Sequence, residues 1–127
     1  MQFHNSKLLA PSVGPFSTYV SANGILFISG QIGLKKSGEL AENFTEEVVT
    51  IMKNIGLILN EAGLSYSDIA SVTIYLKDMK KFGELNLVYK SYFDTSYPAR
   101  TCIAVADLPL NANVEMTVTA AFKAIEL

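Results

Sequence analysis

Hydrophobic and polar residues follow two different periods along this chain, and the change of period divides it into elements. Near the N-terminus, short apolar runs at about 16–21 and 24–29 flank the dipeptide Asn23-Gly24. Asn and Gly tolerate the positive φ angles that a type I′ turn requires, so this segment predicts a β-hairpin. A second turn is expected at Gly38.

From Asn43 onward the apolar residues follow the spacing of one helical face. Asn43 is a suitable N-cap, and the acidic residues of the following turn, Glu46 among them, suit the helix dipole. Gly63 is a natural C-terminal stop. The pattern therefore predicts a helix over 43–62. Its buried face is expected to consist of Phe44, Val48, Ile51, Met52, Ile55, Ile58, Leu59 and Ala62.

The second half of the chain returns to alternation, interrupted by one more helical stretch. Segment 68–78 alternates and predicts a strand. Its core face is expected to carry Ala70, Val72, Ile74 and Leu76. A second helix is expected over about 79–93, because Phe82, Leu85, Tyr89, Tyr92 and Phe93 stand at helical spacing. Pro98 prevents its extension. Two strands follow at about 100–106 and 113–123. The last is expected to present Val114, Met116, Val118, Ala120 and Phe122 to the core.

These elements give the order β-β-α-β-α-β-β, which predicts an α+β fold with both helices on one face of one mixed sheet. The other sheet face would carry small neutral residues, namely Ser71, Thr73, Tyr75, Thr117, Thr119 and Ala121. A solvated face normally carries more long charged side chains, so this composition favours a subunit contact. A threonine-rich solvated sheet is the alternative.

Composition narrows the class of protein. A length of 127 residues, half of them hydrophobic, suits one domain over 1–127 with a packed core. The net charge of −2 and the lack of a basic run argue against nucleic acid as a partner. No apolar run approaches the length that spans a bilayer, so no membrane partner is expected.

Histidine and cysteine usage narrows the class further. The single cysteine cannot form an internal disulfide, and the N-terminus lacks the pattern of a signal peptide, so the cytoplasm is the expected compartment. The one histidine, His4, lies near a terminus that we expect to be mobile. We therefore expect no metal site.

Two charged residues stand in the otherwise apolar segment 98–120. The guanidinium of Arg100 can hold a carboxylate through two parallel hydrogen bonds, although a salt bridge at the start of a strand is the alternative. Glu115 lies on the strand face opposite Val114, so its carboxyl leaves the core; a solvated surface carboxylate is the alternative.

Cys102 shares a strand face with Arg100 because strands have a period of two. A thiol nucleophile would need a histidine partner, and His4 is the only one in the chain. We therefore interpret Cys102 as a residue that lines a pocket, with a small buried side chain as the alternative.

Three motifs are specific in combination: a Ser-Gly-Gln tripeptide at 29–31, a Pro-Ala-Arg-Thr-Cys element at 98–102 and Glu115. With them the chain resembles the RidA (YjgF-type) reactive-intermediate deaminases, and the resemblance covers nearly its whole length. It is carried by "GPFS" (14–17), "LFISGQI" (26–32), "GEL" (38–40), "AGLSYSDI" (62–69), "NLVYKSYF" (86–93), "YPARTCIAVADLP" (97–109) and "VEMTVTA" (114–120).

The resemblance implies a chorismate-mutase-like fold and a homotrimer whose sheets face a central, barrel-like interface. It also implies hydrolysis, without a cofactor, of 2-aminoacrylate, 2-iminobutyrate and related enamine or imine acids to 2-keto acids and ammonia. That activity is the one named 2-iminobutanoate/2-iminopropanoate deaminase. Pyridoxal-phosphate enzymes such as dehydratases release these compounds, so a functional link to them is implied.

The resemblance also implies roles for individual residues. Arg100 would anchor the substrate carboxylate, Glu115 would assist water attack and proton transfer, and Cys102 would line the pocket. Ser29, Gly30 and Asn86 match substrate-binding positions, and Phe16 stands where many members have tyrosine. We expect the site between two chains, with Arg100, Cys102 and Glu115 from one chain and Phe16 from its neighbour.

Two other functions remain as alternatives. A non-catalytic protein that senses 2-keto acids or other small carboxylic acids would need Arg100 but not Glu115. The ribonuclease or translation-inhibitor function often attached to this family is less well supported, because the chain offers no basic stripe and no pair of histidines for RNA cleavage.

Overall fold

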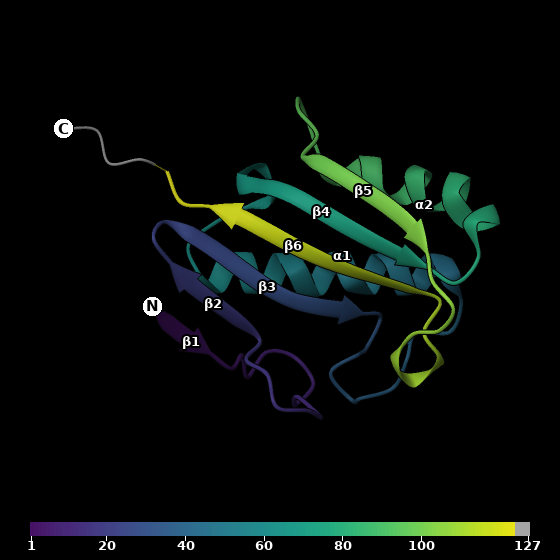
Figure 1. Ribbon diagram of the computed structural model, residues 1–127, viewed down its shortest axis with the longest axis horizontal. Coiled ribbons are helices and arrows are strands. Elements are labelled where there is room, and N and C mark those ends of the chain that lie inside the picture. The colour runs from purple at the N-terminus through teal and green to yellow at the C-terminus, as the bar shows by residue number, and fades with distance from the viewer. Residues whose placement is uncertain (124–127) are drawn as a thin grey trace.

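Among residues 1–123, which the computed structural model describes, six strands form one sheet and both α-helices lie against the same side of it (Figure 1). The strands are β1 (Gln2–His4), β2 (Tyr19–Ala22), β3 (Ile25–Ile32), β4 (Ile69–Leu76), β5 (Ala99–Ala104) and β6 (Val114–Ala121). The helices are α1 (Phe44–Glu61) and α2 (Phe82–Tyr89). The predicted α+β fold is confirmed.

The strand order is β1-β2-β3-β6-β4-β5. Strands β4 and β5 run parallel and are connected through α2, whereas every other neighbouring pair is antiparallel. The sheet is therefore mixed, as predicted. This order places β6, which carries Glu115, between β3 and β4, while β5 with Arg100 forms an edge of the sheet.

Local sequence signals account for the ends of the first hairpin and of α1. Asn23 and Gly24 have φ angles of 50° and 77°, and they connect the paired residues Ala22 and Ile25. The Asn43 side chain accepts a hydrogen bond of 2.9 Å from the Glu46 backbone N–H, so Asn43 caps α1 as predicted. Gly63 follows the helix with a φ of 81°.

The N-terminus is ordered, which corrects the expectation of a mobile terminus. Residues 2–4 form β1 and pair antiparallel with β2. The ring of His4 stacks on the ring of Tyr19, with the ring centroids 4.5 Å apart. A three-residue strand is too short to show a period in the sequence, which is why the pattern did not reveal it.

Several boundaries also differ from the expectation. The first two strands, expected at about 16–21 and 24–29, span Tyr19–Ala22 and Ile25–Ile32. The predicted helix 79–93 contains a shorter α-helix with a 3₁₀ turn on each side, at Met79–Lys81 and Lys90–Tyr92. The tighter i to i+3 bonding of 3₁₀ turns is common at helix ends. A bulge between Ile69 and Ser71 gives the core position to Ile69, so Ala70 is exposed. Phe122 lies beyond the end of β6 and is partly exposed.

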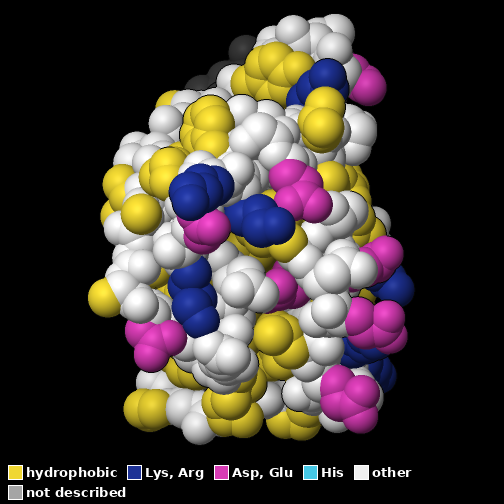
Figure 2. Space-filling view, turned by 90° about the vertical axis from the view of Figure 1, so that its right-hand side faces the viewer, with side chains coloured by type: hydrophobic (Ala, Val, Ile, Leu, Met, Phe, Trp, Pro, Cys, Tyr) yellow, Lys and Arg dark blue, Asp and Glu magenta, His cyan; other side chains and the backbone are white. Residues whose placement is uncertain are grey.

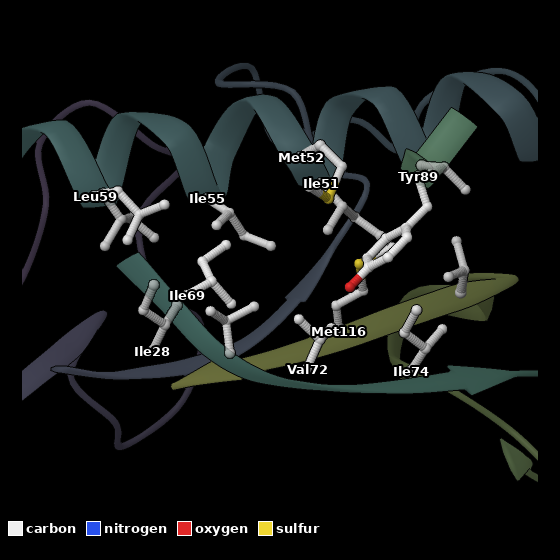
Figure 3. Packing of buried hydrophobic residues seen from close by; sticks show 14 of the residues in the cluster. Ile28, Ile51, Met52, Ile55, Leu59, Ile69, Val72, Ile74, Tyr89 and Met116 are labelled. Carbon is white, nitrogen blue, oxygen red and sulfur yellow. The ribbon is translucent and has the colours of Figure 1, made fainter. Parts of the chain in front are cut away.

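The core lies between α1 and the helix-covered face of the sheet (Figure 3). Ile51, Ile55 and Leu59 of α1 point toward β-strand residues such as Val72 and Met116, and all five are buried. Burying an aliphatic side chain of this size contributes about 1.5–3 kcal/mol. This packing fixes which face of every strand points inward. No helix within residues 1–123 is both long enough and apolar enough to cross a membrane.

The opposite face of the sheet is uncovered in a single chain. It carries the predicted neutral residues of β4 and β6. Strand pairing places three large apolar side chains of β3 and β5 beside them. These are Ile25, Phe27 and Ile103, with 37%, 47% and 43% of their surface exposed. We refer to this surface as the open face. It is more apolar than the sequence pattern alone indicated.

Two tyrosines that pack in or against the core, Tyr89 buried and Tyr66 partly buried, differ in how their hydroxyl groups are satisfied, and this difference can be tested. The Tyr66 hydroxyl donates a 2.7 Å hydrogen bond to the Met52 carbonyl oxygen. The Tyr89 hydroxyl points into the core and makes no hydrogen bond with any described residue (Figure 3). A buried polar group without a partner destabilises the folded state, whereas an apolar replacement of the same shape does not.

We predict that Tyr89→Phe raises the free energy of unfolding by about 1 kcal/mol, because it removes the unpaired hydroxyl and keeps the ring. The matched control Tyr66→Phe should lower it by about 1 kcal/mol, because it removes a formed hydrogen bond. Urea unfolding of the two variants and the wild type measures both changes. If Tyr89→Phe destabilised the protein as much as Tyr66→Phe, the Tyr89 hydroxyl would have a hydrogen-bond partner, which would contradict the structure.

Candidate active site

A cavity of about 400 Å³ lies where the N-terminal segment 9–18 meets the end of β3, β6 and the loop 109–110. Four of the predicted site residues line it: Phe16, Ser29, Gly30 and Glu115. Apolar side chains from the N-terminal segment, β3 and the loop form most of the remaining wall. We call these four residues the carboxyl half-site.

Glu115 lies directly against the backbone of Gly30. The pairing of β3 with β6 shifts register between Ile28 and Gln31, and Gly30 lies within this irregularity. A Cβ atom at position 30 would collide with Glu115 Oε2. Glycine is therefore required at this position by the close approach of the carboxyl group, which explains the Ser-Gly-Gln motif in physical terms.

The carboxyl group of Glu115 is half-buried, and burial raises its pKa above the ordinary value of 4.5. Its side chain makes no hydrogen bond with any residue from 1 to 123. The nearby Ser29 hydroxyl donates a 2.6 Å hydrogen bond to the Ser17 carbonyl oxygen. Glu115 is therefore free to bond to a water molecule or to a ligand in the cavity.

A buried glutamate on α1 fixes the start of β6. Glu47 is 1% exposed, and its two carboxylate oxygens accept hydrogen bonds from the backbone N–H and the side-chain amide of Asn113, at 2.9 and 2.7 Å. Asn113 stands two residues before Glu115. Glu47 was not among the predicted site residues, although its position three residues after Phe44 and four before Ile51 places it on the buried helical face.

The remaining predicted residues gather at the β5 edge of the sheet. Arg100, the only arginine in the chain, donates a 2.8 Å hydrogen bond from Nη1 to Asn86 Oδ1. Its guanidinium carbon lies 4.9 Å from the ring centroid of Tyr89 and 5.4 Å from that of Phe82. These cation–π contacts hold the half-buried cation against α2. Sequence analysis identified neither ring as a partner of Arg100.

Cys102 lies beside Arg100 on β5 and is also half-buried. Burial raises the pKa of its thiol, while the positive charge of Arg100 acts in the opposite direction and is the smaller effect. The thiol form, which is a poor nucleophile, is therefore favoured at neutral pH. We call Asn86, Arg100 and Cys102 the guanidinium half-site.

The expectation that Arg100, Cys102 and Glu115 of one chain face the same substrate is wrong. Arg100 pairs with Val72 and Cys102 with Ile74, so both lie on the helix-covered face of the sheet. Glu115 pairs with Tyr75 and lies on the open face. Phe16 lines the same cavity as Glu115 instead of lying across a boundary from it. The sequence shows the alternation within each strand but not the register between strands.

Within residues 1–123, no three His, Cys, Asp or Glu side chains come close enough together to hold a metal ion. The polar groups of the two half-sites are instead one cation, one carboxyl, one thiol, one amide and one hydroxyl. Such a set can bind an organic acid and move a proton.

The chain is similar to several curated proteins. It is 53% identical to a RutC family protein of Aquifex aeolicus, over 85% of this chain and 89% of that protein. It is 40% identical to the mouse 2-iminobutanoate/2-iminopropanoate deaminase, over 87% of this chain and 84% of that protein. It is 37% identical to the mitochondrial protein Mmf1 of Saccharomyces cerevisiae, over 94% of this chain and 83% of that protein.

Solved structures share the fold. The structure of RidA from an Antarctic Psychrobacter species matches with a TM-score of 0.93 at 30% identity, covering 96% of this chain and all of that one. The structure of Escherichia coli TdcF with bound serine matches with a TM-score of 0.92 at 29% identity, covering 97% of this chain and 100% of that one. The family model described as Endoribonuclease L-PSP matches residues 7–122. The chain therefore belongs to the Endoribonuclease L-PSP family, to which proteins named RidA also belong.

Proposed function

We propose that this chain hydrolyses reactive 2-imino acids and their enamine forms to 2-keto acids and ammonia. In this reaction water adds to the imine carbon, a C–O bond forms, the C–N bond breaks, and the nitrogen leaves as ammonia with the protons that water supplied. The name of the mouse relative, at 40% identity, supports this reaction.

The observation that carries the proposal is the unpaired charge of Arg100. Its guanidinium is half-buried, bonded to a neutral amide and stacked on two rings, and it forms no ion pair with any carboxylate among the described residues. A partly desolvated cation without a counter-ion is a binding site for an anion. This contact set also disfavours the alternative of a salt bridge at the start of β5.

We propose further that a complete site forms between two copies of the chain in a homotrimer. The carboxyl half-site of one copy would face the guanidinium half-site of its neighbour, because the two lie on opposite faces of one sheet. The open face, with Ile25, Phe27 and Ile103 exposed, would supply the contact, the three sheets packing around a central axis.

In such a site each group has a distinct task. Arg100 would hold the substrate carboxylate, with Asn86 fixing the plane of the guanidinium. The Glu115 carboxylate would take a proton from the attacking water and return it to the departing nitrogen. Cys102 would line the pocket as a thiol. No step requires a cofactor, since addition of water and proton transfer suffice.

A second candidate function is binding of small carboxylic acids without turnover. It is favoured by the TdcF structure, which contains bound serine, and by Phe16, which brings no hydroxyl to the cavity. Ribonuclease activity, which the family description names, has less support. On the face that Figure 2 shows, basic and acidic side chains are interspersed, so no continuous basic stripe runs across it.

The cellular context follows from the proposed substrates. Pyridoxal-phosphate enzymes such as dehydratases release enamine and imine acids, so we propose that the chain acts after such an enzyme. The cytoplasm stays a prediction, because the similar yeast protein is named as mitochondrial.

We predict that Arg100→Ala abolishes detectable turnover of 2-iminobutyrate and weakens binding of 2-oxobutanoate. Each charge-assisted hydrogen bond that is lost contributes about 1.5–3 kcal/mol. Arg100→Lys should restore only part of the binding, because an ammonium cannot form the bidentate pair. The control is Lys53→Ala, which removes an exposed cation from α1. Calorimetry measures binding of 2-oxobutanoate, and a semicarbazide-coupled assay measures turnover of 2-iminobutyrate. Wild-type turnover by Arg100→Ala would remove Arg100 from the site.

We predict that Glu115→Gln binds 2-oxobutanoate as tightly as wild type but turns over 2-iminobutyrate about 10²–10⁴-fold more slowly. The variant should also change the pH dependence of stability. Burial raises the pKa of Glu115 in the folded state, so its contribution to stability is fully present below pH 4.5 and is lost as the pH rises through the raised pKa.

The free energy of unfolding of Glu115→Gln, relative to wild type, should therefore increase as the pH rises from 4.5 through that raised pKa. Denaturant unfolding at a series of pH values measures the difference. A difference that is constant with pH would show that Glu115 is solvated, and unchanged turnover would show that it has no part in the reaction.

A further inference from the structure

The cavity of the carboxyl half-site is larger than the chemistry at Glu115 requires. Its volume of about 400 Å³ falls within the range of roughly 300–1,000 Å³ that is typical of pockets for drug-sized ligands. A three-carbon imino acid would leave most of this space unfilled. Most of the other lining side chains are apolar, among them Leu9, Val13, Phe16, Ile32, Leu34 and Leu110.

Four of the five neutral polar side chains in the wall, all but Ser12, are already bonded to the protein itself, and Thr18 Oγ1 accepts its bond from the Ser6 backbone N–H. Ser29 donates to the Ser17 carbonyl, Gln31 to the Ser29 carbonyl and Asn54 to the Leu34 carbonyl. Glu115 is the only ionisable side chain among the lining residues. A polar or charged group of a ligand would therefore find few partners beyond Glu115, and burying it without a partner is unfavourable.

Leu110 is held over this cavity in an uncommon conformation. Its φ and ψ angles of 53° and 29° lie in the left-handed region, which bulky residues rarely adopt. The next residue in the loop is bonded to β4's end, since Lys77 Nζ donates a 2.6 Å hydrogen bond to Asn111 Oδ1. Leu110 is nevertheless 58% exposed in the single chain, so packing within the chain does not account for an apolar residue there.

We infer that the cavity selects 2-imino acids with a branched aliphatic or aromatic side chain over 2-aminoacrylate and other small substrates. The inference rests on the proposed function of the same site. With the substrate carboxylate on Arg100 of the neighbouring copy and the imine carbon at Glu115, the third substituent of that carbon enters the apolar part of the cavity. Leu110 contacts it and determines the specificity.

The first test compares substrates with the wild-type protein. An amino-acid oxidase with catalase generates the imines of alanine, 2-aminobutyrate, leucine and phenylalanine, and semicarbazide reports the imine that escapes hydrolysis. A single methylene in an apolar pocket changes kcat/KM by about 10-fold or more. We expect kcat/KM for the leucine-derived imine to exceed that for the alanine-derived imine by at least about 10-fold.

The second test replaces Leu110 by asparagine. Asparagine has a similar size and tolerates the left-handed conformation, so Leu110→Asn changes polarity while preserving the backbone. We expect the ratio of kcat/KM for the leucine-derived imine to kcat/KM for the alanine-derived imine to fall about 10-fold. The value for the alanine-derived imine should change little. The matched control is Leu87→Asn on α2, because Leu87 is 66% exposed and does not line the cavity.

The outcomes separate this inference from the proposed function. Turnover of all imines with equal kcat/KM, or a ratio that Leu110→Asn leaves unchanged, overturns the inference and leaves the deaminase function standing. Acceleration of no imine overturns the deaminase function. In that case calorimetry with 4-methyl-2-oxopentanoate and pyruvate still decides the selectivity: tighter binding of the larger acid, lost in Leu110→Asn, supports it, and equal binding overturns it.

Discussion

The register of three neighbouring strands is the constraint on which the candidate site depends. β4 pairs with β5 on one side and with β6 on the other, and side chains along each strand alternate between the two faces. Because the core packing under α1 fixes Val72 and Ile74 as inward, Arg100 must share the helix-covered face and Glu115 must leave it. A slip of one residue in either pairing would reverse this arrangement.

The two half-sites differ in how the fold prepares their charges. Arg100 is held by an amide and two aromatic rings on α2, none of which neutralises it, so the fold retains a positive charge for an anion. Glu115 is held against Gly30 in a mostly apolar cavity, where burial favours its neutral form. Both groups are costly to bury alone. A substrate that carries a carboxylate and a basic nitrogen would offset both costs at once.

Most of the fold could be predicted from the sequence, because α1, the Asn23-Gly24 hairpin and the alternation of β6 are local signals. The short β1 and the bulge beside Ile69 could not, since neither changes the periodicity over enough residues. For the site, the sequence identified four residues of the cavity wall and, beside the guanidinium, Asn86 but neither aromatic ring. It also wrongly grouped Glu115 with Arg100 and Cys102. Which strands pair, and in what register, is set by contacts between distant segments, such as that of Glu47 with Asn113.

Mixing two inactive variants decides whether one catalytic site needs two copies of the chain. Arg100→Ala and Glu115→Gln each lose one half-site, and co-refolding them in equal amounts produces mixed oligomers. With random assembly in a closed ring, about one quarter of the interfaces combine an intact guanidinium half-site with an intact carboxyl half-site. The account predicts recovery of about a quarter of wild-type turnover. No recovery, from oligomers that light scattering shows to be mixed and larger than the 13.8 kDa chain, would contradict it.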